Sequence, residues 1–113
     1  MLKPILVFLF LAAPAFADSP ATAKQIRAAV SGNTVQGNMS ASGAYSEFYA
    51  ADGIIRGKSY TGTWTTEGDA MCFAYGEAPV CWQAVISGDQ ISWIVDGTEG
   101  GTGTILPGNP NTW

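Results

Sequence analysis

The sequence predicts a mainly β domain, an antiparallel meander of seven or eight short strands preceded by one short helix. Two observations carry this prediction. From Thr34 onward, short runs rich in β-branched and aromatic residues alternate with glycine-containing turns. Every connection between these runs is short, which makes consecutive strands antiparallel neighbours. Such a meander hides its edge strands by closing into a small barrel or by packing as a sandwich, and we favour the barrel.

The helix is expected at about residues 22–31. Thr22 and Gln25 have the spacing of a capping box, and Gly32 supplies a C-terminal stop. The apolar residues that recur with helical spacing are Ile26, Ala29 and Val30. A helix this short is not stable alone, so we expect it to dock across one end of the barrel or beside one edge.

Eight short segments between glycine-rich turns are predicted to be strands: 34–39, 44–50, 53–58, 60–66, 70–75, 80–87, 90–96 and 101–106. Pairs such as Asp52-Gly53 and Gly88-Asp89 mark turns between them. Period-two alternation places Trp64 and Trp93 in the interior and the threonines next to Trp64 outside. Gly62 and Gly103, each within Thr-Gly-Thr, are expected to mark bulges or bends.

The two cysteines, Cys72 and Cys81, flank a predicted turn at Gly76-Glu77. A hairpin centred on that turn sets Cys72 directly opposite Cys81, within disulfide reach. Their spacing is neither thioredoxin-like nor zinc-like, and the chain has no histidine to complete a zinc site. We therefore predict a structural disulfide on the outer face of the sheet.

Residues 1–17 have the layout of a secretory signal peptide. Lys3 is followed by an apolar run, and Ala15-Phe16-Ala17 forms an A-x-A cleavage site. The apolar run is shorter than the roughly 20 residues of a membrane-spanning helix. The sequence thus predicts a periplasmic or secreted protein with a single domain over residues 18–113 and no transmembrane segment after cleavage. Export also favours the disulfide, because that space is oxidising.

Charge and composition argue against several classes of function. The chain has a formal net charge of −4 at pH 7, which argues against a nucleic-acid partner. It lacks histidine, and no serine lies in a nucleophile-elbow pattern. Most of the acidic residues lie next to a glycine at predicted turns, where acidic side chains commonly stabilise the turn by hydrogen bonding to the backbone. We expect no catalytic residues, no metal site, no cofactor and no enzymatic activity.

Glu47 differs from the other acids because it lies within a predicted strand, between Tyr45 and Tyr49. Two interpretations follow. The three residues form an acidic and aromatic contact surface, with Arg56 or Lys58 across the hairpin; or Glu47 is a solvent-facing residue in a cross-strand salt bridge. We favour the second interpretation and keep Tyr45, Glu47 and Tyr49 as surface candidates for binding.

The aromatic residues either fill the core or line a cavity for an apolar ligand, as in calycin barrels. Gly62-Thr63-Trp64 is similar to the G-x-W motif of lipocalins, although that motif belongs to the first strand and here lies mid-chain. Six-residue strands make a narrow barrel that side chains fill, so we expect core packing rather than a pocket.

A broader resemblance is carried by four segments: YAADGIIRG (49–57), YTGTWTTEGDAMCFAYG (60–76), CW (81–82) and GTGTILPGNP (101–110). Together with Gly32-Asn33-Thr34 they resemble small exported proteins of alphaproteobacteria whose function is unknown. The resemblance implies an exported β domain and carries no activity or site residues. The chain is also similar to periplasmic lysozyme inhibitors in size, acidity and its single cysteine pair, without their inhibitory-loop pattern.

These observations lead to two hypotheses about binding. The first is a non-catalytic exported domain that binds a periplasmic protein or a component of the cell envelope. The alternative is a calycin-like carrier of a small apolar ligand. An enzyme that uses only carboxylates is a third hypothesis, which we favour least.

Overall fold

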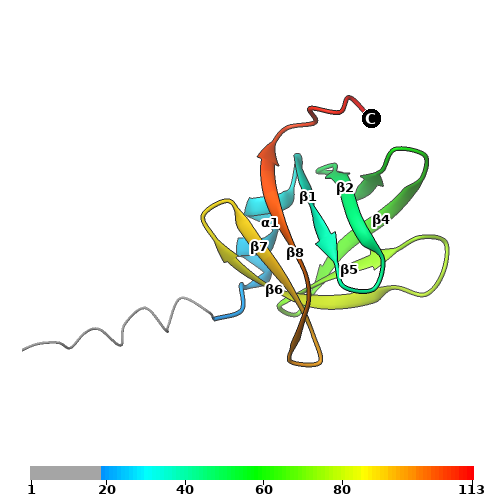
Figure 1. The fold of residues 1–113 in the computed structure, drawn as a ribbon. Coiled ribbons are helices and arrows are strands. Elements are labelled where there is room, and N and C mark those ends of the chain that lie inside the picture. The colour runs from blue at the N-terminus through cyan, green and yellow to red at the C-terminus, as the bar shows by residue number, and fades with distance from the viewer. Residues whose placement is uncertain (1–18) are drawn as a thin grey trace, which may run out of the picture.

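The protein is a closed eight-stranded antiparallel barrel with one short helix before the first strand (Figure 1). The computed structural model describes residues 19–113, so the predicted signal peptide, residues 1–17, lies outside the described part of the chain. Each strand pairs with its neighbours in sequence, and the first strand pairs with the last. The prediction of a mainly β barrel preceded by a helix is confirmed.

In chain order the elements are α1 (Ala23–Val30), β1 (Asn33–Met39), β2 (Gly43–Tyr49), β3 (Ile54–Arg56), β4 (Thr61–Glu67), β5 (Ala70–Ala74), β6 (Val80–Ser87), β7 (Gln90–Val95) and β8 (Thr98–Pro107). The largest difference from the expected bounds is at β8, which begins at Thr98 rather than at residue 101. Thr98 pairs with Val95 of β7, so the neighbouring strand extends β8 through a polar segment that has no strand pattern of its own.

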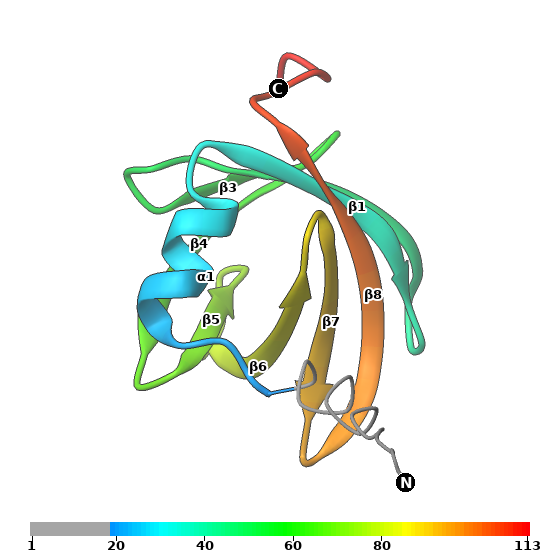
Figure 2. The ribbon, with the colours of Figure 1, turned by 90° about the vertical axis from the view of Figure 1, so that its left-hand side faces the viewer.

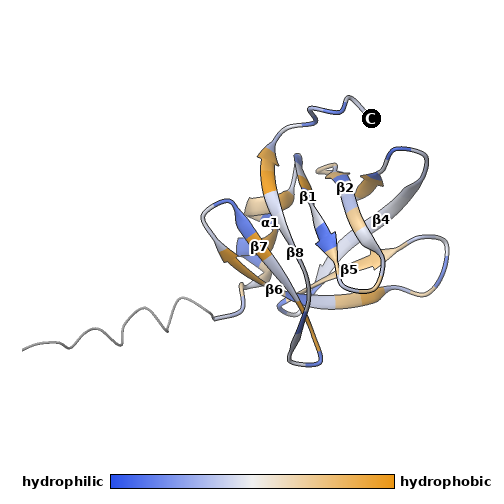
Figure 3. Ribbon diagram, in the orientation of Figure 1, coloured by the Kyte–Doolittle hydropathy of each residue, from blue (hydrophilic) through white to orange (hydrophobic). Residues whose placement is uncertain are grey.

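The register decides which residues face the interior. Val35 of β1 opposes Glu47 of β2 on one side and Ile105 of β8 on the other. Because opposed residues share a face, all three point inward. The buried residues that form the hydrophobic core are Ala21, Ile26, Val30, Val35, Tyr49, Ile55, Trp64, Met71, Phe73, Ala84, Ile91 and Trp93. Hydrophobic residues on β5, β6, β7 and β8 are visible in Figure 3.

The two ends of the barrel differ. The register brings the connections at residues 40–42, 57–60, 75–79 and 96–97 to one end, which we call the mouth. The connections at 50–53, 68–69 and 88–89 lie at the other end. Asp69 accepts a hydrogen bond from the Ala23 N–H at 2.9 Å, so α1 begins at the end opposite the mouth.

The helix α1 packs against β1, β4 and β5 (Figure 2). The predicted capping box is present: Thr22 Oγ1 accepts from the Gln25 N–H, and Gln25 Oε1 accepts from the Thr22 N–H. Ile26 and Val30 are fully buried and belong to the same core as the strands. After the helix, Gly32 has φ +77° and its N–H donates to the Tyr49 carbonyl at 2.7 Å. The predicted helix and its stop are confirmed.

The bulges expected at Gly62 and Gly103 are not present. Gly62 pairs regularly with Ile55, and Gly103 pairs regularly with Gly37. The one register shift between β7 and β8 lies between Trp93 and Ile94. Both glycines instead allow close approach of an aromatic side chain inside the barrel, as described below.

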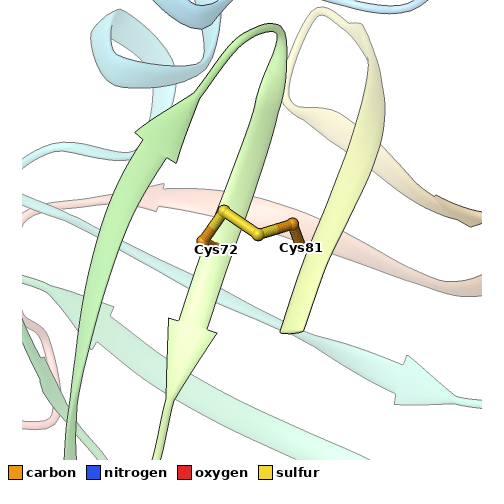
Figure 4. Close-up of a disulfide and its surroundings, with 2 residues drawn as sticks. All are labelled: Cys72 and Cys81. Atoms are coloured by element: carbon orange, nitrogen blue, oxygen red, sulfur yellow. A yellow bond between two sulfur atoms is a disulfide. The ribbon is translucent and has the colours of Figure 1, made fainter. Parts of the chain in front are cut away.

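The predicted disulfide joins Cys72 of β5 to Cys81 of β6 (Figure 4). The two residues are directly opposed, and Phe73 opposes Val80, as the hairpin predicts. Met71 and Phe73 face the interior, so the bridge lies on the outer face of the barrel. Cys72 is nonetheless only 1% exposed.

Removing the disulfide is expected to lower the free energy of unfolding by about 2.7 kcal/mol, because the bridge restricts a short loop in the unfolded chain. Urea titration of the Cys72→Ala/Cys81→Ala variant measures the loss. Wild-type protein reduced with dithiothreitol is the matched control, because it keeps both sulfur atoms, and it should be destabilised similarly. A double variant as stable as the oxidised wild type would contradict the prediction.

Within residues 19–113, no helix combines the length and the hydrophobicity that a membrane span requires.

Candidate functional site

A cavity of about 720 Å³, open to solvent on one side, lies at the mouth end of the barrel. This volume lies within the range of roughly 300–1,000 Å³ that small-molecule sites occupy. Seven aromatic side chains line it: Tyr45, Tyr49, Tyr60, Phe73, Tyr75, Trp82 and Trp93. Glu47 also reaches its wall.

Side chains fill the deeper part of the barrel, where Met71, Ile91 and Trp93 are at most 1% exposed, and the open space lies towards the mouth. Inward-facing glycines let neighbouring atoms pack close to the wall. Gly37, Gly101 and Gly103 occupy inward positions on β1 and β8, where they contribute no side chain. A Cβ atom on Gly103 would lie 2.5 Å from Tyr45 Oη and 2.6 Å from Val35 Cγ1. The glycine therefore lets the Tyr45 hydroxyl and Val35 pack against the barrel wall.

Glu47 faces the barrel interior and is 6% exposed. The prediction that it is a solvent-facing residue in a salt bridge was wrong. Glu47 opposes the fully buried Val35, whereas Arg56 opposes Phe48, on the other face of β2. The placement of Tyr45, Glu47 and Tyr49 on the surface is corrected with it, because Tyr49 is only 1% exposed and all three line the cavity.

Three tyrosine hydroxyls donate hydrogen bonds to the Glu47 carboxylate. Tyr49 donates to Oε1 at 2.8 Å, and Tyr60 donates to Oε2 at 2.6 Å. The Tyr75 hydroxyl lies 3.0 Å from both oxygens. Tyr49 comes from the same strand as Glu47, Tyr60 precedes β4, and Tyr75 follows β5. We call Glu47 and these three tyrosines the carboxylate cluster.

The carboxylate raises the pKa values of its tyrosine neighbours. Burial is the largest cause of the raised pKa of Tyr49, Tyr60 and Tyr75, and the negative charge of Glu47 and the hydrogen bonds to it add to the effect. Burial also raises the pKa of Tyr45. The phenols consequently stay protonated even at pH 10, where an ordinary tyrosine is half ionised, and those of the cluster remain hydrogen-bond donors to the carboxylate.

The negative charge of the cluster has no cationic partner in the part of the chain that the structure describes. The hydrogen bonds to Glu47 come from tyrosine hydroxyls, and among residues 19–113 no lysine or arginine forms an ion pair with it. Neutral hydroxyls solvate a carboxylate but do not cancel its charge. The cavity wall therefore carries one buried, unbalanced acid.

Two further glycines allow rings of the cluster to approach the backbone. A Cβ on Gly57 would lie 2.2 Å from Tyr60 Cζ, and a Cβ on Gly62 would lie 2.7 Å from Tyr75 Cδ1. Tyr60 and Tyr75 then meet edge to face, with ring centroids 6.0 Å apart. The positions of both hydroxyls thus depend on glycine at these two sites.

Contacts among Phe73, Trp93 and Tyr45 form the deeper wall of the cavity. The Trp93 ring packs edge to face on Phe73 with centroids 5.3 Å apart. Its Nε1–H donates to Tyr45 Oη at 3.0 Å, and the Tyr45 hydroxyl donates to the Thr102 carbonyl at 3.0 Å. The polar atoms of these rings are therefore paired, which favours one fixed arrangement of the wall.

The structure brings the three sequence candidates together and adds residues that the sequence did not identify as site residues: Tyr60, Phe73, Tyr75, Trp82 and Trp93. One signal was available. Period-two alternation puts Tyr45, Glu47 and Tyr49 on a single face of β2, so burial of the tyrosines implies burial of the acid. No local pattern links Tyr60 or Tyr75 to Glu47.

The turn acids have structural roles. Asp69 holds the start of α1, and Asp52 Oδ1 accepts from the Ile54 N–H at 3.3 Å. In the described part of the chain, no group of three or more cysteine or acidic residues is arranged to hold a metal ion.

Comparison of the chain with protein-family models, with curated proteins and with solved structures finds no match. Its function has to be inferred from the geometry of the cavity.

Proposed function

We propose that this protein is an exported, non-catalytic binding protein whose barrel holds a small ligand. The observation that carries the proposal is the aromatic cavity of about 720 Å³ with its opening at the mouth. Of the two binding hypotheses drawn from the sequence, this geometry favours the small-molecule carrier, because cavities of this size and lining are typical of ligand sites.

Export to the periplasm or the medium is part of the proposal. It is supported by the signal-like residues 1–17 and by the Cys72–Cys81 disulfide, since such bridges persist in oxidising compartments.

Binding without catalysis is supported by the chemistry of the wall. The chain has no histidine, the commonest general base. The Glu47 carboxylate accepts hydrogen bonds from three tyrosine hydroxyls, so most of its acceptor positions are occupied.

The rim of the mouth is the one feature that favours a protein partner. Tyr60, Tyr75 and Val80 are 43%, 48% and 54% exposed, and exposed apolar residues are common at protein interfaces. All three also line the cavity, so they equally form an apolar entrance for a ligand. A partner protein is therefore kept as an outcome of the test.

The cavity is tested with N-phenyl-1-naphthylamine, a neutral apolar dye whose fluorescence rises in a dry site. We expect wild-type protein to bind the dye and the Val80→Trp variant to bind it about tenfold more weakly, because the larger ring fills the entrance. Thr63→Trp is the matched control: it adds the same ring at an exposed position on the outer face of β4 and should bind like wild type.

Native mass spectrometry of protein purified from its own source supplies a second measurement. A retained small molecule supports the carrier. Failure of the wild type to bind the dye, together with a retained protein and no small molecule, would refute it in favour of the protein-binding module.

A further inference from the structure

We propose that the ligand is a small organic cation with a fully alkylated ammonium group, bound in the cavity beside Glu47. This inference rests on the proposed function and names the chemistry of its ligand. It follows from three features of the cavity: an unbalanced buried charge, a wall of aromatic rings, and a carboxylate whose hydrogen-bonding positions are largely occupied.

The charge is the first feature. A carboxylate that is 6% exposed loses much of its hydration, and burial of an unpaired charge is unfavourable. The three hydroxyls offset part of this loss without neutralising the charge. A cation in the cavity supplies the missing opposite charge, whereas an anion meets repulsion from Glu47 in a poorly screened interior.

The charge also argues against a neutral apolar ligand as the best occupant. Such a ligand would exclude water from the Glu47 carboxylate, and it offers neither a positive charge nor a hydrogen-bond donor in place of that water. Loss of water from a charged group without compensation weakens binding. A cation of the same shape avoids this loss, so the cavity discriminates by charge between molecules of equal size.

The aromatic wall is the second feature. Tyrosine and tryptophan faces attract cations through the ring quadrupole, and quaternary ammonium groups are bound in this way in aromatic cages. Tyr60, Tyr75 and Trp82 lie at or near the mouth, and Trp93 lies deeper. The rings also accommodate the methyl groups of an alkylated ammonium, which a small hydrated metal ion lacks.

The occupied carboxylate is the third feature. An ionised carboxylate has about four lone-pair positions, and the hydroxyls of Tyr49, Tyr60 and Tyr75 direct three protons at them. A primary ammonium needs three acceptors for its N–H groups and finds few left. A fully alkylated ammonium has no N–H donor, so charge and ring contacts are all it requires.

The test uses three probes of nearly equal shape: choline, which is cationic; 3,3-dimethyl-1-butanol, its neutral isostere; and 3,3-dimethylbutanoate, an anion. Isothermal titration calorimetry on the wild-type protein should give the affinity order cation, neutral, anion. We expect choline to bind about tenfold or more tightly than the alcohol, in line with a desolvated cation–π site beside a charge.

The variant Glu47→Gln keeps the shape of the side chain and removes its charge. It should reduce the preference for choline over the alcohol several-fold, and the remainder, about two- to fivefold, comes from the ring contacts that still favour the cation. Glu67→Gln is the matched control, with the same substitution at an exposed position at the far end of β4, and should keep the wild-type preference. Circular dichroism confirms that each variant is folded.

Equal or tighter binding of the alcohol to wild-type protein would overturn the proposal, and this measurement needs no variant to fold. A preference for choline that is undiminished in folded Glu47→Gln protein would overturn the role of Glu47. Binding of the neutral dye without binding of choline would refute the cation while leaving the ligand-binding function intact, so the two failures are distinguishable.

Discussion

None of the four tyrosines of the chain is expected to ionise near pH 10 while the protein is folded. All four line the cavity, and burial together with the charge of Glu47 raises the pKa of each above the ordinary value of 10.0. Absorbance at 295 nm, which reports phenolate, should stay flat through pH 10 and rise only as the barrel unfolds.

The sign of the effect on stability follows from proton binding. In the folded protein the raised pKa keeps each phenol protonated, whereas the unfolded chain loses its phenolic protons from about pH 10 upward. The stabilisation is therefore complete below pH 10 and is lost as the pH rises toward the folded-state pKa values. The free energy of unfolding should fall steeply above pH 10.

Tyr49 contributes most to this slope. It is 1% exposed, and each proton difference between the folded and unfolded states changes the free energy of unfolding by about 1.4 kcal/mol per pH unit. Tyr60 and Tyr75 are 43% and 48% exposed, so solvent screening reduces their share. Urea titrations between pH 8 and 11 measure the slope.

The Tyr49→Phe variant is the comparison for this experiment, because it removes one phenol and keeps the ring. Its loss of stability above pH 10 should be shallower than that of the wild type. Phenolate absorbance at pH 10 in protein with a native circular dichroism spectrum would contradict the predicted shift.

Replacement of Trp93 by alanine is expected to lower the free energy of unfolding by about 3–5 kcal/mol. Trp93 is 1% exposed, it packs on Phe73 and Trp82, and its indole N–H bonds to Tyr45. The variant loses buried apolar area and leaves a hydroxyl lone pair without its donor. Domains of this size are stable by only about 5–15 kcal/mol, so the variant should be marginal at 25 °C.

Trp113→Ala is the matched control for this prediction. It makes the same substitution in the C-terminal tail, where Trp113 is half-buried and outside the core, and should change stability by about 1 kcal/mol or less. Equal losses in the two variants, measured by urea titration, would contradict the assignment of Trp93 to the core.

Much of the fold was predictable because it depends on local chemistry. The capping box at Thr22 set the start of α1, and the short turn at Gly76-Glu77 fixed the pairing of Cys72 with Cys81. Because the connections are short, consecutive strands can pair only as antiparallel neighbours. Interior faces followed from alternation wherever large apolar residues recurred, as at Trp64 and Trp93.

The candidate site was predictable only in part. Glu47 was recognised as unusual, but its face on β2 was assigned wrongly, since charged residues rarely enter a core. The partners that make its burial tolerable, Tyr60 and Tyr75, lie 13 and 28 residues away in the sequence. Nothing local signals that three hydroxyls converge on one carboxylate.

Local sequence patterns were sufficient to predict the helix, seven or eight strands, their antiparallel order and the disulfide, because each depends on neighbouring residues or on a short hairpin. The sequence favoured a barrel but left a sandwich open, and the pairing of β1 with β8 shows that the sheet closes. Whether the barrel interior is packed or contains a cavity depends on the combined side chains of all eight strands. Here glycines on β1 and β8 let neighbouring side chains pack against the wall, and tyrosines from separate segments meet around one buried acid.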